Sequence, residues 1–510
     1  MGSSSIPRKV LKIAARQSDL ARLQAESVGR ALQLNYPELK IEFHFRASLG
    51  DQNQNDPLWK MPEKGVFTED FYRDLVDEKV DLVVHSWKDL PIESKAETEI
   101  FATLAREDQR DLFLLNRENF ARVKASREMK VLTSSPRRSY NLETFFKNYF
   151  PCEIKQTHFL NVRGNILTRL KKLFSEDADG LILAKAALDR LLASKDPQYV
   201  SAQNEIRKIL KGCQWMCLPL TLNPSAAAQG ALAIEAKKNT IWKEVLASIQ
   251  DRQCFESVQK ERQILQKYGG GCHQKIGVSV LPRSYGELCF LRGLTDRGEV
   301  LDSVALSSGT TFEKARSMAH IFPQAKDSGQ FFDRIKLNGS HIDSAVKDPF
   351  IWIAKEDAAP EKSSFSGLQT IWTSGLKTWR KLAQRGIWVN GSAESLGENE
   401  APRIEALLEQ DPIKWTKLTH LEGFQNPDMK VVATYELLAR ESKQNLKGVT
   451  HFYWSSGSAF DLIYQAHPEM KTSWHFCGPG HSYEHIKMRL GSEAQLRICL
   501  SFEDWLEKVL

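Results

Sequence analysis

The first part of the chain alternates short apolar runs with stretches of helical spacing and ends in VDLVVHSWKDLPIE, Val80–Glu93. Earlier strand candidates are Lys9–Ala15 and Lys40–Ala47. Leu20–Leu34 and Glu69–Glu78 between them have the apolar periodicity of helices. This β-α-β-α-β succession predicts a parallel sheet with crossover helices.

A lysine and an aspartate follow the last of these strands. The apolar run Leu82–Val84 passes into polar residues that include Lys88 and Asp89. Ligands of open α/β sheets bind beyond the carboxyl ends of the strands, so these two side chains stand where a binding site is expected. On spacing alone, a solvated Lys–Asp pair at a strand end is the more frequent explanation.

Composition narrows the class of protein. With 510 residues, the chain is long enough for several domains, and its hydrophobic content of 42% is ordinary for a globular protein. No apolar run approaches the ~20 residues of a membrane helix, and the N-terminus lacks the apolar segment of a secretory signal. The net charge of +6 is modest for this length. We therefore expect a cytoplasmic protein with no nucleic-acid or membrane partner.

Cysteine usage gives no sign of a metal. The eight cysteines are scattered, and the only close pair, Cys213 and Cys217, has no second pair to complete a zinc site. We expect reduced thiols and no bound metal. Cys272 stands out because it follows three glycines, Gly269–Gly271, which suit a close backbone approach. The alternative is a spare thiol on a flexible linker.

Several arginines fall near predicted strand ends or helix starts. They are Arg16, Arg137, Arg138, Arg163, Arg169 and Arg190. Guanidinium groups gathered at such positions would bind a ligand that carries several carboxylates. Taken alone, an isolated arginine or an Arg-Arg pair is more often an ordinary surface charge.

Together these motifs resemble the porphobilinogen deaminase (hydroxymethylbilane synthase) family over roughly Lys9–Pro323. HSWKDLP at His85–Pro91 is similar to the family signature HS-x-KD-[LV]-P. The further matching segments, in chain order, are Ala14–Ser18, Lys64–Thr68, Thr133–Arg138, Val162–Leu170, Asp179–Leu191, Pro224–Glu235, Glu261–Leu265 and Gly269–Gly277.

The resemblance implies a reaction and a set of site residues. Four porphobilinogen molecules would be joined head to tail into hydroxymethylbilane with release of ammonia. Asp89 would be the catalytic carboxylate that holds pyrrole N–H groups, and Cys272 would bind a dipyrromethane cofactor through a thioether. Besides these two, the residues expected to contact the cofactor are Ser86, Lys88, Thr133, Ser134, Ser135, Arg137, Arg138, Arg163 and Gln229. The residues expected to bind substrate are Arg16, Ser18, Phe67, Arg169 and Arg190.

The chain departs from the family pattern at several small residues. Ala15 replaces a threonine, Leu132 and Ala187 each replace a glycine, and Lys275 replaces an apolar residue or proline. Ala228 replaces the first glycine of P-A-x-G-Q-G. That change would displace the turn if the backbone there needed positive φ.

The resemblance also implies a domain organisation. We expect an α/β protein with two hinged domains like those of periplasmic binding proteins, residues 9–110 with 222–243 and residues 111–221. A small third α+β domain, residues 244–340, would carry the cofactor cysteine. Its expected strands are Ile276–Leu281, Leu288–Gly293 and Val300–Leu306, and its expected helix is Thr311–Phe322.

The remaining residues, 345–510, predict an additional α/β domain. Its expected strands are Phe350–Ala354, Gly386–Val389, Val431–Thr434, His451–Trp454 and Ser473–Cys477, and its main helices Leu376–Gln384, Ser458–Gln465 and Tyr483–Leu490.

This last third resembles the end of uroporphyrinogen-III synthase at His451–Gln465 and at the turn that runs from His475 to Gly480. That family folds hydroxymethylbilane between two lobes and cyclises it. Ser455, Ser456 and Tyr464 would then line the site, whereas Gly480 and His481 depart from the family's turn. A domain without activity remains the alternative.

The rival interpretation of the whole chain is a two-domain binding protein or sensor for a polyanionic ligand. It predicts the same basic residues but needs no cysteine on a glycine loop. The deaminase interpretation predicts porphobilinogen as the small-molecule substrate and a monomer.

Overall fold

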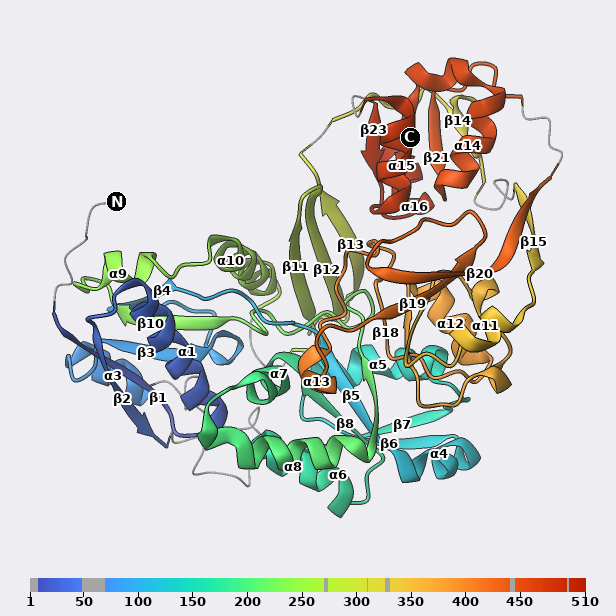
Figure 1. Cartoon of the computed structure of the whole chain (residues 1–510). Helices are drawn as coiled ribbons and strands as arrows, with labels where there is room; N and C mark the ends of the chain where they lie inside the picture. Colours follow the sequence, from blue (N-terminus) through green and yellow to red (C-terminus); the bar gives the residue numbers. More distant parts are fainter. Residues whose placement is uncertain are drawn as a thin grey trace.

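The protein has a mixed α/β fold with several sheets, as the sequence predicts (Figure 1). The structure is a computed structural model, and it describes residues 8–47, 69–269, 274–309, 311–325, 331–440, 445–492 and 495–510. No helix within these ranges combines the length and the apolarity needed to cross a membrane.

The first sheet is built from the β-α-β-α-β succession. In sheet order its strands are β2 (Lys40–Arg46), β1 (Val10–Arg16), β3 (Leu82–Ser86), β10 (Leu232–Lys237) and β4 (Thr98–Ala102). β1 runs parallel to β2 and β3, whereas β10 is antiparallel to β3. Helix α1 (Asp19–Asn35) buries Leu23, Val28 and Leu32, and α3 (Glu69–Val76) precedes β3. The predicted strands and helices of this region are confirmed.

The second sheet repeats the same pattern. Its order is β7 (Gln156–Leu160), β6 (Glu128–Leu132), β8 (Gly180–Ala184), β5 (Asp111–Asn116) and β9 (Cys213–Cys217). Again a parallel trio is joined by an antiparallel strand, here β5. The helices of this unit are α4 (Phe120–Ser126), α5 (Pro136–Tyr149), α6 (Ile166–Ser175), α7 (Lys185–Ala193) and α8 (Val200–Lys211).

The chain passes between these two sheets twice. The first crossing, residues 103–110, leads from β4 to β5, and the second crossing, residues 218–231, leads from β9 to β10. The two crossings run side by side, because the Glu107 N–H donates to the Gly230 carbonyl over 3.2 Å and the Arg106 side chain donates to the Gln229 carbonyl over 2.9 Å. Within the described residues, they are the two connections of the chain between the first and second sheets.

A three-stranded antiparallel sheet follows. Its strands are β11 (Gly277–Arg283), β12 (Gly286–Leu294) and β13 (Val300–Ser307), which confirms the three predicted strands. The helical stretch before them is divided into α9 (Lys243–Ala247) and α10 (Arg252–Lys267), since Asp251 caps the second helix by accepting from the Cys254 N–H.

The helix predicted over Thr311–Phe322 is wrong. Met318–His320 forms one 3₁₀ turn, and Ile321–Phe322 forms strand β14, which pairs with the distant strand β21 (His451–Trp454). Ile321 and Phe322 are buried by this pairing. Their local sequence spacing does not reveal the distant strand that buries them. The residues expected to form the third domain, 244–340, contain β14 and β15 (Phe332–Lys336). In the structure, both strands pair within the C-terminal sheets.

The C-terminal third forms two lobes (Figure 1). The six-stranded lobe has the order β15, β20 (Met429–Ala439), β19 (Trp415–His420), β16 (Phe350–Ile353), β17 (Thr370–Thr373) and β18 (Gly391–Ser392). The four-stranded lobe has the order β14, β21, β22 (Trp474–Cys477) and β23 (Leu496–Ile498), all parallel. The helices of the two lobes are α11 (Ser340–Ala345), α12 (Leu376–Gln384), α13 (Glu405–Leu408), α14 (Gly457–Ala466), α15 (His481–Leu490) and α16 (Phe502–Val509).

Most predicted elements of this third are confirmed, but the strand at Gly386–Val389 is wrong. Ile387 and Val389 are buried there without strand pairing, because this stretch packs against the second sheet. The Trp388 indole donates to the Trp215 carbonyl over 3.0 Å, and the Cys217 N–H donates to the Asn390 carbonyl over 2.7 Å. The six-stranded lobe and the second sheet thus share one hydrophobic core.

Candidate functional site

The predicted Lys–Asp pair lies immediately beyond the carboxyl end of β3. Trp87–Asp89 forms a 3₁₀ turn, and Trp87 is 3% exposed and packs against Phe255 with 5.3 Å between ring centroids. The buried indole anchors the turn, while Asp89 is exposed. An apolar anchor beside two polar side chains holds them in place at a strand end.

Lys88 reaches toward the second crossing. Its Nζ donates to Gln229 Oε1 over 3.4 Å. Burial lowers the pKa of Lys88; the negative charge of Asp89 opposes this shift, and the positive charge of Arg138 adds to it. Lys88 and Asp89 from the first sheet therefore lie close to Arg138 from the second.

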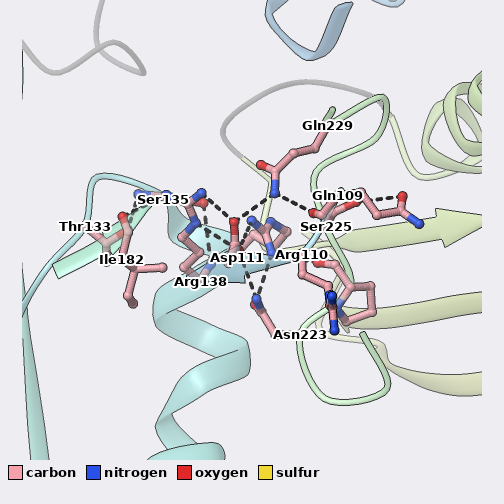
Figure 2. Close-up of polar contacts among 12 residues, drawn as sticks. Gln109, Arg110, Asp111, Thr133, Ser135, Arg138, Ile182, Asn223, Ser225 and Gln229 are labelled. Carbon is pink, nitrogen blue, oxygen red and sulfur yellow. Dashed lines mark hydrogen bonds and ion pairs between the residues drawn. The ribbon is translucent and has the colours of Figure 1, made fainter. Parts of the chain in front are cut away.

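The centre of the polar network is Asp111, which the sequence analysis did not single out (Figure 2). This residue begins β5 and is completely buried. Its carboxylate accepts from Arg137 Nη2 at 2.7 Å, Arg138 Nη2 at 2.6 Å, Arg138 Nε at 3.0 Å, Gln229 Nε2 at 2.8 Å and Asn223 Nδ2 at 2.9 Å. Burial opposes ionisation, but the two arginines outweigh it and hold the pKa of Asp111 well below the ordinary range.

Arg137 and Arg138 lie in the first turn of α5. Both were expected to contact the cofactor, but their side chains donate to protein groups. Arg137 is 3% exposed and also donates to Asn223 Oδ1 at 3.0 Å and the Pro224 carbonyl at 2.6 Å, so its side chain anchors the second crossing. Arg138 is nearly as buried and donates to the Ile182 carbonyl at 3.3 Å. Its position beside Lys88 keeps it close to the predicted site, whereas Arg137 faces the crossing.

The three hydroxyl residues before α5 hold the local backbone. Thr133 Oγ1 accepts from the Ser135 N–H over 3.3 Å, and Ser135 caps α5 by accepting from the Arg138 N–H. Ser134 donates to the Val162 carbonyl over 2.6 Å and accepts from the Val162 N–H over 3.0 Å. These bonds fix the turn that presents the arginines, in keeping with the usual role of such residues at a helix start.

Arg163 and Arg169 lie at the start of α6, as predicted. The helix is capped by Asn165, and Arg169 Nε donates to the Gly164 carbonyl over 2.7 Å. Burial lowers the pKa of Arg169, Arg138 and Arg163 lower it further, and Asp89 opposes them. Both arginines thus belong to the same group of charges as Asp89.

The other expected residues lie at nearby element ends. Arg190 on α7 donates to the Gly230 carbonyl over 2.7 Å and so contacts the second crossing. Ser86 hydrogen-bonds Gln24 of α1 at 3.0 Å. Ser18 caps α1, and Arg16 ends β1 beside Arg46 of β2.

Phe67 and Cys272 lie outside the described residues. The described strand after Cys272 is fixed to the second crossing: the Val278 N–H donates to the Ser225 carbonyl over 3.0 Å, and Ser225 N–H donates to Ser279 Oγ over 2.8 Å. A Cβ on Gly277 would meet the Pro224 carbonyl oxygen at 2.3 Å, so this approach requires glycine.

Glu261 of α10 joins both crossings to this strand. Its carboxylate binds the Arg106 guanidinium at 2.7 and 2.8 Å and accepts from the N–H groups of Ala228 and Val280, each at 2.7 Å. Ala228 keeps the left-handed backbone, with φ of +67°, although it replaces a glycine. The turn is therefore retained, with the strain that positive φ imposes on an L-residue.

Comparison with known proteins decides the family. A family model described as porphobilinogen deaminase, dipyrromethane cofactor binding domain, matches residues 11–243. The porphobilinogen deaminase of Caldicellulosiruptor saccharolyticus is 34% identical over 270 residues, which cover 53% of this chain and 84% of the relative. The chain belongs to the porphobilinogen deaminase family.

Further relatives extend the match. The porphobilinogen deaminase of Prochlorococcus marinus is 30% identical over 335 residues, covering 65% of this chain and 94% of the relative. Among solved structures, the periplasmic sulfonate-binding protein SsuA of Methylobacillus flagellatus is 13% identical. The match covers 51% of this chain and 72% of the SsuA chain, and its TM-score of 0.28 is too low to bear on the fold.

The described residues fit the family's dipyrromethane cofactor. This group carries several carboxylates and two pyrrole N–H groups, so it needs an excess of cations and one carboxylate. Asp89 is the exposed carboxylate of this group of charges, and four cations accompany it, namely Lys88, Arg138, Arg163 and Arg169. The excess of positive charge suits a polycarboxylate ligand.

Proposed function

We propose that this chain is a porphobilinogen deaminase whose catalytic carboxylate is Asp89. The single observation that carries the proposal is the position of Asp89, exposed beyond β3 and within the electrostatic reach of Lys88 and Arg169. One carboxylate among several cations meets a substrate that has one pyrrole N–H and two carboxylates.

Asp89 supplies the acid–base chemistry. Its carboxylate accepts the pyrrole N–H and stabilises the positive charge that develops on the ring when ammonia departs. The same group accepts or returns a proton as each ring is joined, and water finally releases the linear tetrapyrrole. Trp87 keeps the Asp89 turn in place because its indole is buried.

The cations orient the substrate. Lys88 and Arg169 hold acetate and propionate groups, and the contact between Lys88 and Gln229 ties this binding to the second crossing. When bound through Cys272, dipyrromethane supplies a covalent primer to which porphobilinogen is joined. Arg138 and Arg163 would hold its carboxylates on the side of the second sheet.

The test of catalysis is Asp89→Asn. The variant should fold and bind substrate but turn over about 10²–10⁴-fold more slowly, because it loses a positioned acid–base group. Asp428→Asn, an exposed aspartate in the six-stranded lobe, is the matched control and should keep full activity. Robust turnover by Asp89→Asn would refute the assignment.

The test of cofactor attachment is intact mass. Cys272→Ala should lack the dipyrromethane adduct, whereas Cys152→Ala, which changes a partly exposed cysteine elsewhere, should keep it. An adduct that survives in Cys272→Ala refutes the role of this thiol. A wild-type protein without any adduct would favour the polyanion-binding rival.

We further propose that the C-terminal lobes cyclise hydroxymethylbilane. The supporting observation is the pair of mainly parallel α/β lobes, which meet at the turn after β22, where His481 contacts Glu398 at 3.3 Å. Ser455 and Ser456 follow β21, and Ser456 caps α14. Tyr464 stacks on Phe460 at 4.9 Å and so packs on the lobe's core, which makes the two serines the stronger candidates for lining.

A further inference from the structure

The segment that joins β18 to α13, residues 393–404, contacts nearly every unit of the molecule. We call this segment the strap. It leaves the six-stranded lobe at β18 and leads to α13, which packs on α7, after touching both crossings, the three-stranded sheet and the four-stranded lobe. Neither the family resemblance nor the proposed reactions assign it a role.

One end of the strap holds the second crossing. Glu394 Oε1 accepts from the Leu220 N–H at 2.9 Å, and Glu394 Oε2 accepts from the Thr221 N–H at 2.7 Å. Leu396 packs in the same small core as Leu220 and Leu288 of β12. A half-buried carboxylate that accepts from two neighbouring backbone N–H groups is a directional attachment, because both bonds are charge-assisted.

The other end of the strap holds the first crossing. The Pro402 carbonyl accepts from Arg110 Nη2 at 2.6 Å, and the Arg403 carbonyl accepts from Lys185 Nζ. Arg110 and Lys185 both pair with Asp108, at 2.7 and 3.3 Å. This end is therefore bound to a buried cluster of charges at the start of β5.

The middle of the strap touches the four-stranded lobe. Glu398 lies between Lys417 Nζ at 2.6 Å and His481 Nε2 at 3.3 Å, and the His481 ring stacks on Phe424 with 3.4 Å between centroids. A Cβ on Gly397 would lie 3.1 Å from Gly480 Cα, so the two backbones are in close contact. Gly480 and His481 are the residues that depart from the synthase turn.

The strap's backbone is strained. Glu394, Ser395 and Arg403 have φ of +54°, +64° and +53°. L-residues rarely adopt this region, and such conformations persist where the surrounding contacts impose them. Release of either end would therefore let the whole segment relax.

We propose that the strap couples the two crossings of the deaminase to the contact between the C-terminal lobes. A change in the angle between the first two sheets moves the crossings, and the strap carries that movement to Glu398 and His481. The coupling is reciprocal, so opening of the lobes must also loosen the crossings. This coupling goes beyond the proposed reactions, and it can be measured without enzyme turnover.

The test is hydrogen exchange on the full-length holoprotein. Glu394→Gln keeps the shape of the side chain but presents one acceptor oxygen to two N–H groups. Amide exchange in peptide 478–484 should become at least about fivefold faster, the lower end of typical coupling. Conversely, His481→Gln should accelerate exchange in peptide 218–222 by a similar factor.

Two controls separate coupling from loss of fold. Lys430→Gln removes a surface pair with Asp348 in the same lobe and should leave both peptides unchanged. Exchange in β21, a core strand, should be the same in every variant. If Glu394→Gln affects only residues 218–222 and its own neighbours, or if His481→Gln affects only the four-stranded lobe, the coupling is refuted. His481→Gln alone decides the matter if Glu394→Gln fails to fold.

Discussion

The second sheet is joined to its neighbours by two junctions of opposite chemistry. Toward the first sheet, the crossings are held by buried charges around Asp111 and Asp108. Toward the six-stranded lobe, the contact is aromatic: Phe145 meets Trp379 edge to face at 5.5 Å, and Phe150 meets Trp388 at the same distance.

The difference predicts which of the two junctions moves. Buried ion pairs depend on geometry and add little net stability, so a crossing built from them can rearrange with a charged ligand. Exposing a continuous apolar core to water costs free energy, so this junction resists opening. The six-stranded lobe should therefore travel with the second sheet, while the first sheet moves against both.

The largest expected effect is that of Asp111→Asn. The substitution leaves two buried guanidinium groups without their counter-charge, which should lower the free energy of unfolding by about 3–5 kcal/mol. Urea unfolding of the variant and the wild type measures this loss. A change below about 1 kcal/mol would contradict the central place given to this carboxylate.

The same variant should alter the acid sensitivity of the protein. Because the pKa of Asp111 is lower in the folded state than in the unfolded state, its stabilisation is present above the ordinary aspartate pKa of about 4 and is lost as the pH falls further. Asp111→Asn should therefore flatten the loss of stability below that pH.

The aromatic junction should respond less strongly and without any pH dependence. Trp379→Phe keeps a ring in the core but removes the 3.0 Å hydrogen bond to the Tyr149 carbonyl and leaves that acceptor unpaired. We expect a loss of about 2 kcal/mol in urea unfolding, with porphobilinogen KM unchanged. An altered KM would mean that this junction also takes part in substrate closure.

Lys88 should make substrate binding sensitive to alkaline pH. Since burial lowers the pKa of Lys88, the ammonium loses its proton at a lower pH than an ordinary lysine. KM for porphobilinogen should rise by up to about tenfold as the pH approaches 10, the worth of one charge-assisted hydrogen bond. Lys88→Arg keeps its charge and should show a flat KM; an equal rise in that variant would exclude Lys88 as the cause.

The smallest expected effect is that of Ala228→Gly at the second crossing. Glycine relieves the positive φ of +67° but gains unfolded-state entropy, so the variant should be more stable by at most about 1 kcal/mol. Thermal unfolding measures the gain. A clear loss of stability would show that the methyl group packs usefully there.

The sequence predicts local features well and distant pairings poorly. The bounds of α12 and β21 follow directly from local apolar periodicity. Ile321–Phe322 could not be recognised as a strand, because its partner β21 lies far along the chain. The motif around Lys88 and Asp89 predicted their position beyond β3.

Other parts of the site were not predictable in this way. Asp111 was missed, although an aspartate directly before the apolar run LFLL is a sign of a buried charge. The sequence also does not show which of the two neighbouring arginines anchors the second crossing. In the structure Arg137 donates to that crossing, while Arg138 lies near Lys88. That choice depends on the second crossing, far away in the sequence.

The most direct test of the two proposed activities is product analysis. The purified protein is incubated with porphobilinogen alone, the products are oxidised, and the uroporphyrin isomers are separated. We expect uroporphyrin, mostly of isomer III. Isomer I alone would contradict the cyclising role of the C-terminal lobes, and the absence of any porphyrin would contradict the deaminase assignment itself.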